Sequence, residues 1–203
     1  RGFLTLDEDE ILARMRAAHA AAFQICVHAI GDRAVARCID LYERLLTESP
    51  RRDHRHRIEH ASIVAPEQIA RLARLGLCVS TQPLFIHSEK EWLHRRLGAE
   101  RARNVYPLRA LLDGGVLVGG ASGGPGESLV VLHAIQCCVT REGFEPQQSL
   151  SPAEAVRLFT SDAARLQFEE AEKGTLAAGK RADLVVLSAN PLAAQPTRIG
   201  ELR

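Results

Sequence analysis

The chain has 203 residues, of which 46% are hydrophobic and 25% charged, and its formal net charge is +1. These values are typical of an ordinary globular domain, and the near-neutral charge argues against nucleic acid or an anionic membrane surface as the main partner. No apolar run approaches the ~20 residues that cross a bilayer, and the first residues lack the pattern of a signal peptide. Because the chain begins with Arg1 rather than Met, we interpret its start as a cut.

The cysteines indicate a reducing compartment. There are five, an odd number, and they lie among apolar residues without a C-x-x-C pair. This pattern is more typical of core thiols than of disulfides or of a cysteine nucleophile. We therefore expect buried, unpaired cysteines and a cytoplasmic location.

Strands and helices are predicted to alternate along the chain. Thr5 and Glu8 fit a capping box that opens a helix to about residue 21, and apolar periodicity predicts the later elements. The predicted helices lie at 34–48, 66–75, 106–112, 129–139 and 152–159, and a shorter helix follows to residue 166. The predicted strands lie at 23–28, 57–60, 77–81, 116–118 and 174–187. The mixed stretch 84–104 receives no assignment, and helix 129–139 is apolar enough to be buried.

This alternation favours a parallel sheet covered by helices, which is the α/β class. The first two strands end in His28 and His60, which are 32 residues apart in the chain. One strand-plus-helix unit of a (β/α)₈ barrel takes about 31 residues. We therefore predict a partial barrel with four of the eight strands, and both histidines at the carboxyl ends of neighbouring strands.

His28 and His60 are the candidate metal ligands. Two neutral imidazoles at one mouth of a sheet can bind Zn²⁺ or a similar divalent ion, and such an ion activates water and polarises a substrate carbonyl. A catalytic zinc commonly has three protein ligands, so two histidines alone are too few. The alternative is that each histidine only makes a hydrogen bond where its strand meets a loop.

Side chains near the two histidines are candidates for substrate contacts. Asp32 follows the first strand and is expected to orient its histidine or a substrate, or else to cap the next helix. Gln82 follows the third strand, where a substrate contact and a turn hydrogen bond are both open. Trp92, with nearby arginines, is a candidate for a lid, although a solvated helix face explains the arginines equally well. Glu59 should point away from the second histidine, which favours a structural ion pair.

A second histidine pair, His54 and His56, forms an H-x-H within the basic run 51–57. No apolar strand precedes it and arginines surround it, so we predict a solvated loop rather than a metal site. The same loop could touch phosphate groups, although the near-neutral remainder of the chain argues against nucleic-acid binding.

Several motifs occur in a fixed order along the chain. They are H-A-I-G-D-R-A-V at 28–35, R-I-E-H-A at 57–61, S-T-Q-P at 80–83, W-x-x-x-R-L-G-x-E-R at 92–101, Y-P-L-R-A-L-L-D-G-G-V from Tyr106 and G-K-R-A-D-L-V-V-L from Gly179. Each motif is weak by itself, but the ordered set resembles the amidohydrolase superfamily. The branch it resembles most is amidohydrolase family 3, the YtcJ-like proteins.

The resemblance covers the C-terminal part of a family member. It implies about the last four strands of a hydrolase (β/α) barrel at 1–170, and a C-terminal strand of a small composite β-sandwich at 171–203. It also implies a metal-dependent hydrolase, with zinc as the expected ion, that cleaves amide-type C–N bonds of small molecules with metal-activated water. In that family His28 and His60 match metal ligands, whereas the other ligands, an H-x-H and usually a carboxylated lysine, would lie before Arg1.

The family's eighth strand normally ends in G-S-D, whose aspartate binds metal and moves the proton. Gly123 stands at that position here, so the resemblance implies no catalytic residue in this chain and impaired hydrolysis, because general acid–base catalysis contributes about 10²–10⁴-fold. The competing prediction is a non-catalytic remnant, or a half-barrel that acts by association. Part of a barrel leaves two strand edges open, so we expect self-association or a missing N-terminal half as partner.

Overall fold

The computed structural model describes residues 7–203, so Thr5 of the predicted capping box lies outside the described residues. The strands are β1 Cys26–Ala29, β2 Arg57–His60, β3 Cys78–Thr81 and β4 Val118–Gly120. The α-helices are α1 Glu8–Ala20, α2 Asp32–Glu48, α3 Pro66–Leu75, α4 Phe85–Leu97, α5 Ala99–Ala102, α6 Leu108–Asp113, α7 Val131–Thr140, α8 Pro152–Leu158 and α9 Ser161–Leu166. Short 3₁₀ turns follow at Arg141–Gly143, Pro146–Gln148 and Pro196–Glu201.

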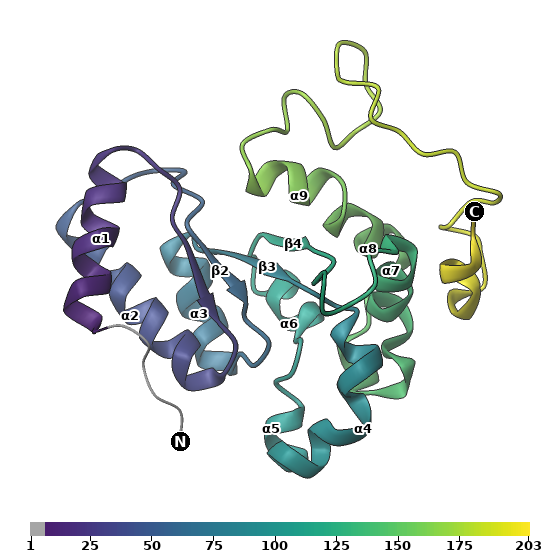
Figure 1. Cartoon of the computed structure of the whole chain (residues 1–203), viewed down its shortest axis with the longest axis horizontal. Helices are drawn as coiled ribbons and strands as arrows, with labels where there is room; N and C mark the ends of the chain where they lie inside the picture. Colours follow the sequence, from purple (N-terminus) through teal and green to yellow (C-terminus); the bar gives the residue numbers. More distant parts are fainter. Residues whose placement is uncertain (1–6) are drawn as a thin grey trace.

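Within residues 7–203, the strands form one parallel sheet in the order β1-β2-β3-β4 (Figure 1). Helices fill the connections, with α2 after β1, α3 after β2 and α4 to α6 after β3, since parallel strands require long crossovers. The sheet is open, and β1 and β4 are its edges. The predicted α/β class with four parallel strands is confirmed.

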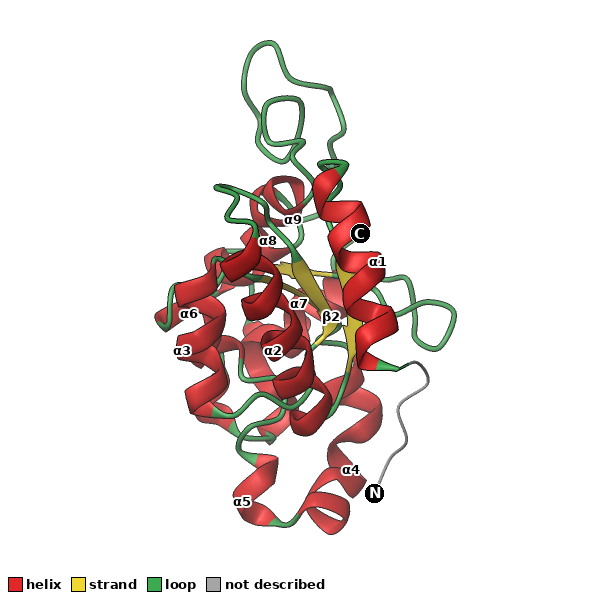
Figure 2. Cartoon of the chain, turned by 90° about the vertical axis from the view of Figure 1, so that its left-hand side faces the viewer, coloured by secondary structure: helices red, strands yellow, loops and turns green. Residues whose placement is uncertain are grey.

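The two faces of the sheet differ in polarity. Ile58, Val79 and Val118 are at most 1% exposed and pack in the main core with apolar residues of α2, α3 and α6. Figure 2 shows α2 and α3 in front of the sheet. On the opposite face of β2, Arg57 and Glu59 form an ion pair, as the alternation of a strand requires. The predicted ion pair of Glu59 is confirmed.

The stretch 84–104, which the sequence left unassigned, folds into α4 and α5. Its apolar residues form a second cluster, which includes Ile86, Leu93 and Tyr106 and is separate from the main core. Trp92 packs partly buried against this cluster, and the guanidinium of Arg96 lies 4.5 Å from its ring centroid. The α4–α5 region lies at the lower end of the molecule in Figure 1.

The segment 174–187 does not form the predicted strand. It runs away from the helices as a long loop (Figure 1), and Leu184, Val185 and Val186 are 56%, 80% and 84% exposed. A strand is stable only when its backbone groups pair with a neighbour, and no strand of residues 7–203 pairs with this segment. The chain then returns to α7, where the N–H of Gly200 donates to Oε1 of Gln136 at 2.9 Å.

Burial differs from the sequence prediction at two places. The helix α7 is not buried throughout, because Val130 and Val131 at its start are 47% and 43% exposed while Ile135 is 5% exposed. Cys26 is exposed, whereas the other four cysteines are buried, and all five are free. None of the helices within residues 7–203 combines the length and the apolar character needed to cross a membrane.

Candidate metal centre

His28 and His60 lie side by side at the carboxyl ends of β1 and β2. Their ring centroids are 4.5 Å apart and their planes meet at 71°. His28 is exposed and His60 is half-buried, so the pair is accessible from solvent. The predicted proximity of the two rings is confirmed, and their role as metal ligands stays a prediction.

The contact between the rings depends on an unusual backbone at the end of β2. The register pairs His28 with Glu59, and Ala29 with His60, so strict alternation would place the two histidines on opposite faces of the sheet. His60 has a φ of +73° and Ala61 a φ of +44°, and we attribute the meeting of the rings to this left-handed turn. Such a conformation costs about 1–3 kcal/mol for a residue other than glycine and is found mainly at functional sites.

Gln82 orients the ring of His60. The Gln82 residue is only 5% exposed, and its Oε1 accepts a hydrogen bond from Nδ1 of His60 at 2.7 Å. Because an amide oxygen cannot donate, neutral His60 carries its proton on Nδ1 and a lone pair on Nε2. Hydrogen bonds of this kind fix the tautomer of metal-binding histidines. Of the two predicted roles of Gln82, the hydrogen bond is present and the substrate contact stays a prediction.

Asp32 is the first residue of α2, and Gly31 is the N-cap, so the capping role considered for Asp32 is wrong. Its carboxylate accepts from the N–H of Arg33 at 2.7 Å and, in the first turn, interacts favourably with the helix dipole. Within residues 7–203 no hydrogen bond joins Asp32 to His28. Trp92 belongs to the second apolar cluster. Substrate contacts by Asp32 and Trp92 stay predictions.

Gly123 occupies a left-handed and crowded position in the turn after β4. Its φ is +79°, and a Cβ built on it would lie 2.8 Å from Cε2 of Phe85 and 3.4 Å from Cγ of Gln82. The turn therefore comes within side-chain reach of the residue that orients His60. Phe85, the first residue of α4, fills the space that an aspartate at this position would need.

The described residues provide only part of a metal site. Residues 7–203 contain no group of three or more His, Cys, Asp or Glu side chains that could hold a metal ion. The imidazole donors and the unprotonated Nε2 of His60 suit zinc, but a catalytic zinc commonly has three protein ligands. His28 and His60 therefore fit one side of a metal centre and not a complete one.

Comparison with known proteins identifies the family. The sequence pattern described as the amidohydrolase family matches residues 1–203. The chain belongs to this family.

The relatives of this amidohydrolase chain are longer than the chain itself. Putative amidohydrolase YtcJ of Bacillus subtilis is 31% identical over 201 residues, which cover 95% of this chain and 37% of that protein. N-substituted formamide deformylase of Arthrobacter pascens is 30% identical over 185 residues, which cover 88% of this chain and 33% of that protein. The crystal structure of an uncharacterized metal-dependent hydrolase from Pyrococcus furiosus superposes with a TM-score of 0.84 at 33% identity, covering 94% of this chain and 39% of that one. The chain thus corresponds to between 33% and 39% of the length of these proteins.

The H-x-H of this amidohydrolase chain is buried, so the predicted solvated loop is wrong. His54 is 5% exposed and His56 is 0% exposed. Nδ1 of His56 accepts from the N–H of Ile25 at 3.0 Å, which leaves the His56 proton on Nε2. This Nε2–H donates to Nδ1 of His19 at 2.9 Å, and Nε2 of His19 donates to the carbonyl of Ser49 at 2.9 Å.

His54 completes this buried histidine cluster. Its Nδ1 accepts from the N–H of His56 at 2.9 Å, and its Nε2 donates to the carbonyl of Leu75 at 2.9 Å. Burial lowers the pKa of His56 to about 3 and also lowers the pKa of His54. Both rings are therefore neutral at neutral pH, and none of the ring nitrogens of His19, His54 and His56 is left for a metal ion.

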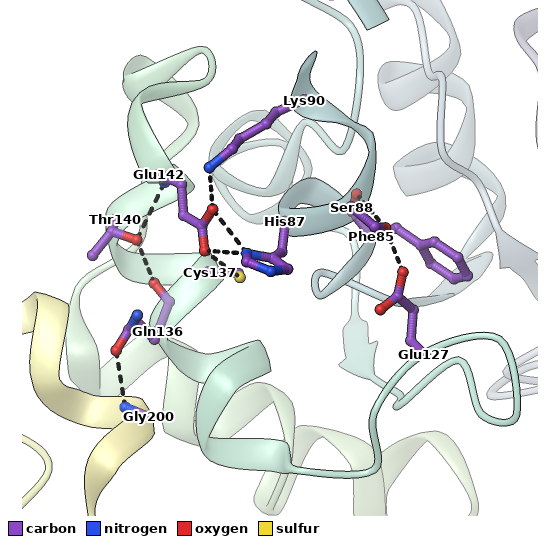
Figure 3. Close-up of polar contacts among 10 residues, drawn as sticks. All are labelled: Phe85, His87, Ser88, Lys90, Glu127, Gln136, Cys137, Thr140, Glu142 and Gly200. Atoms are coloured by element: carbon purple, nitrogen blue, oxygen red, sulfur yellow. Dashed lines mark hydrogen bonds and ion pairs between the residues drawn. The ribbon is translucent and has the colours of Figure 1, made fainter. Parts of the chain in front are cut away.

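Polar contacts hold α4 against the rest of the chain (Figure 3). Glu142 accepts from Nδ1 of His87 at 2.9 Å and from Nζ of Lys90. On the other side of α4, Oγ of Ser88 donates to the carboxylate of Glu127. Glu127 is the nearest carboxylate after the glycine-rich turn, and it is bonded to α4 rather than to the histidine pair.

Proposed function

We propose that His28 and His60 belong to the metal centre of a metal-dependent hydrolase that cleaves amide-type C–N bonds of small molecules. The observation that carries this proposal is the contact of two imidazoles, 4.5 Å apart, at the carboxyl ends of adjacent strands. Barrel enzymes keep their chemistry at this end of the strands. Membership of the amidohydrolase family and the similarity to a formamide deformylase support the class of bond.

The residues of the chain would have distinct tasks in this centre. His28 and Nε2 of His60 would hold a divalent ion, with zinc favoured by imidazole ligands, and the bound ion would activate water and polarise a carbonyl. In the neutral ring of His60, Gln82 keeps the proton on Nδ1, so Nε2 is available as a ligand. Asp32 and Gln82 follow two of the strands and Trp92 lies on the next helix, which supports them as substrate contacts.

A second candidate function is binding of a metal ion or a partner without hydrolysis. Two observations favour it for the chain by itself. No third ligand accompanies the histidine pair within residues 7–203, and Gly123, crowded by Phe85, supplies no carboxylate. We therefore propose that any hydrolysis requires groups that the described residues do not provide.

Metal binding by the purified protein tests both candidates. We expect about one Zn²⁺ or Co²⁺ per chain, lost in the double variant His28→Ala/His60→Ala. The matched control His87→Ala/His94→Ala removes two exposed histidines of α4 and should retain the ion. Turnover of N-benzylformamide that disappears with the ion would establish the hydrolase, and metal binding without turnover would establish the second candidate. The absence of bound metal in the wild type would overturn the metal centre.

The open sheet supports a proposal about association. β1 and β4 each have one unpaired edge within residues 7–203, and such edges invite pairing with another chain. We expect self-association, or association with a complementary N-terminal half of the barrel. Sedimentation velocity that shows a sharp monomer over a tenfold range of concentration would contradict self-association.

The domain boundary and the location are proposed on simpler grounds. The helix α9 ends at Leu166 and a long loop follows, which supports a boundary near residue 170 between a barrel part and a sandwich segment. Five free cysteines support a reducing, cytoplasmic location.

A further inference from the structure

A cavity of about 460 Å³ opens at the amino-terminal end of the sheet. It is lined by residues 51–55 before β2, by 73–78 from the end of α3 into β3, by Gly115 and Leu117 before β4, and by Arg165 of α9. His28 and His60 lie at the opposite ends of the strands, and a strand of four residues is about 13 Å long. The cavity is therefore separate from the candidate metal centre, and its volume lies within the range of about 300–1,000 Å³ usual for ligand sites.

Arginines dominate the wall of this arginine cavity, and they are Arg51, Arg52, Arg55, Arg74 and Arg165. Arg55 is paired with Asp53 and Glu170, and Arg74 is paired with Glu43. The five arginines and these three carboxylates together carry a net charge of +2 around the cavity. A charged, recessed surface of this kind concentrates ions of opposite sign.

The arginines differ in what their guanidinium groups bind. Arg51 donates to the carbonyl oxygens of His19 and Phe23 at 3.2 and 2.9 Å, and it is fixed in place like Arg55 and Arg74. In contrast, the guanidinium groups of Arg52 and Arg165 have no hydrogen-bond acceptor within residues 7–203. Fixed arginines thus shape the rim, and two free ones remain to take a ligand.

One part of the cavity wall is apolar. Leu75 and Leu117 are half-buried and line it, while Leu77 and Cys78 beside them are 1% and 3% exposed. Burial raises the pKa of Cys78 to about 11, while the positive charges of Arg55 and Arg165 act in the opposite direction. Both guanidinium groups therefore lie close enough to this wall to act on the thiol.

We propose that the arginine cavity binds a small phosphate monoester with an apolar organic group. A phosphate monoester carries about −1.5 to −2 charges at neutral pH, which matches the charge around the cavity. The planar guanidinium groups of Arg52 and Arg165 can each bond two phosphate oxygens. The apolar part of the wall formed by Leu75 and Leu117 receives the organic group, so the ligand is neither a bare ion nor a neutral molecule.

Titration of the full chain with phenyl phosphate tests this proposal. We expect saturable binding that weakens as NaCl is raised and that is tighter than the binding of inorganic phosphate. In a nuclear magnetic resonance titration, shifts should concentrate at residues 51–55, 73–78, 115–117 and 165. The double variant Arg52→Gln/Arg165→Gln should bind at least about tenfold more weakly, because hydrogen bonds to charged groups are among the strong ones.

The matched control is Arg95→Gln/Arg103→Gln, which removes the same charge from two exposed arginines at the other end of the molecule. It should bind phenyl phosphate like the wild type, and circular dichroism should show that both double variants fold. Equal loss of binding in the two double variants would overturn the proposal, because only net charge would then matter. Equal affinity for phenyl phosphate and inorganic phosphate would also overturn it, since the apolar wall would contribute nothing.

Discussion

The sheet carries a histidine cluster at each end, and the two clusters differ in what their ring nitrogens do. At the carboxyl end, His28 is exposed and His60 is half-buried. A hydrogen bond from Nδ1 of His60 to Gln82 holds the ring of His60 and leaves its Nε2 without a partner among residues 7–203. At the amino end, His19, His54 and His56 are at most 5% exposed and every ring nitrogen has a protein partner. A histidine is therefore a ligand candidate only where the fold leaves a nitrogen unpaired.

The two clusters also differ in the elements that they connect. The buried histidine cluster joins α1, the start of β1, the basic loop and the end of α3 through neutral hydrogen bonds. Among residues 7–203, the exposed pair joins no elements beyond its own strands and Gln82, and it needs a left-handed backbone at His60. The amino end of barrel strands commonly serves stability and the carboxyl end chemistry, and under the proposed function the two clusters would follow that division.

The largest expected effect comes from His56→Ala. This change removes the acceptor of the Ile25 N–H and the donor to His19, and each buried group left without a partner costs about 1–3 kcal/mol. The cavity left by the ring adds to this cost, so we expect the free energy of unfolding to fall by about 3 kcal/mol or more. Urea unfolding monitored by circular dichroism measures it. A loss below about 1 kcal/mol would show that the buried cluster does not stabilise the fold.

Lowering the pH should also reduce the free energy of unfolding, by somewhat less than the variant His56→Ala does. The pKa of His56 is about 3 in the folded chain and about 6.5 in the unfolded chain, so between these values only the unfolded chain binds the proton. The stabilisation is complete above pH 6.5 and falls by up to about 1.4 kcal/mol per pH unit below it. We expect a loss of about 2 kcal/mol between pH 6.5 and pH 5, to which His54 adds in the same direction.

The variant His56→Gln separates this effect from other titrations, because it should remove much of the slope between pH 6.5 and pH 5. Carboxylates act at lower pH. The pKa of Glu154 is lowered to about 2 by hydrogen bonds from Arg109 and Ser151, so its contribution is lost only below about pH 4.5. Equal slopes in the wild type and His56→Gln would contradict the assignment to the histidine.

The separation along the sequence of the residues in contact decides how much of this molecule could be predicted from its sequence. The predicted strand that ends in His28 has a local apolar pattern, the one that ends in His60 repeats its closing histidine, and the spacing of the two histidines matches one barrel unit. The burial of His56 depends instead on His19, 37 residues away, and on backbone groups of other elements, so no local signal revealed it. The basic surroundings of the H-x-H even suggested solvent.

The other differences have similar causes. The helices α4 and α5 were missed because their apolar residues form a small separate cluster rather than a regular stripe toward the main core. The segment 174–187 has the local pattern of a strand, but pattern alone does not supply a neighbouring strand. The left-handed φ of His60, which brings the histidine rings together, also has no signature in the residue type.

The variant Gly123→Asp tests whether a carboxylate can be added beside His28 and His60 at the carboxyl end of the sheet. We expect no hydrolysis and a loss of about 1–2 kcal/mol, since a side chain at a φ of +79° is strained and its Cβ approaches Phe85. The matched control is Gly115→Asp, which has a φ of +78° and nothing within 4 Å of the built Cβ. It should cost less, and the difference between the two variants measures the crowding by Phe85.

Turnover of N-benzylformamide by Gly123→Asp would contradict this prediction, because it would show that the carboxylate alone completes the centre. The double variant Gly123→Asp/Phe85→Ala gives the carboxylate more room. It should regain the part of the free energy of unfolding that crowding by Phe85 removes. Loss of the partly buried Phe85 ring offsets some of this gain. We still expect no turnover from it, since a third metal ligand is missing within residues 7–203.

The smallest effect is expected from His28→Ala, which is the direct counterpart of His56→Ala at the other end of the sheet. Without metal, removal of this exposed side chain should change the free energy of unfolding by no more than about 0.5 kcal/mol. Zinc at about 100 times its dissociation constant should stabilise the wild type by about 2.7 kcal/mol, because it binds only the folded chain, and should stabilise the variant far less. If His28→Ala in the absence of metal were as destabilised as His56→Ala, both clusters would be structural. This result would contradict a metal site at the carboxyl end of the sheet.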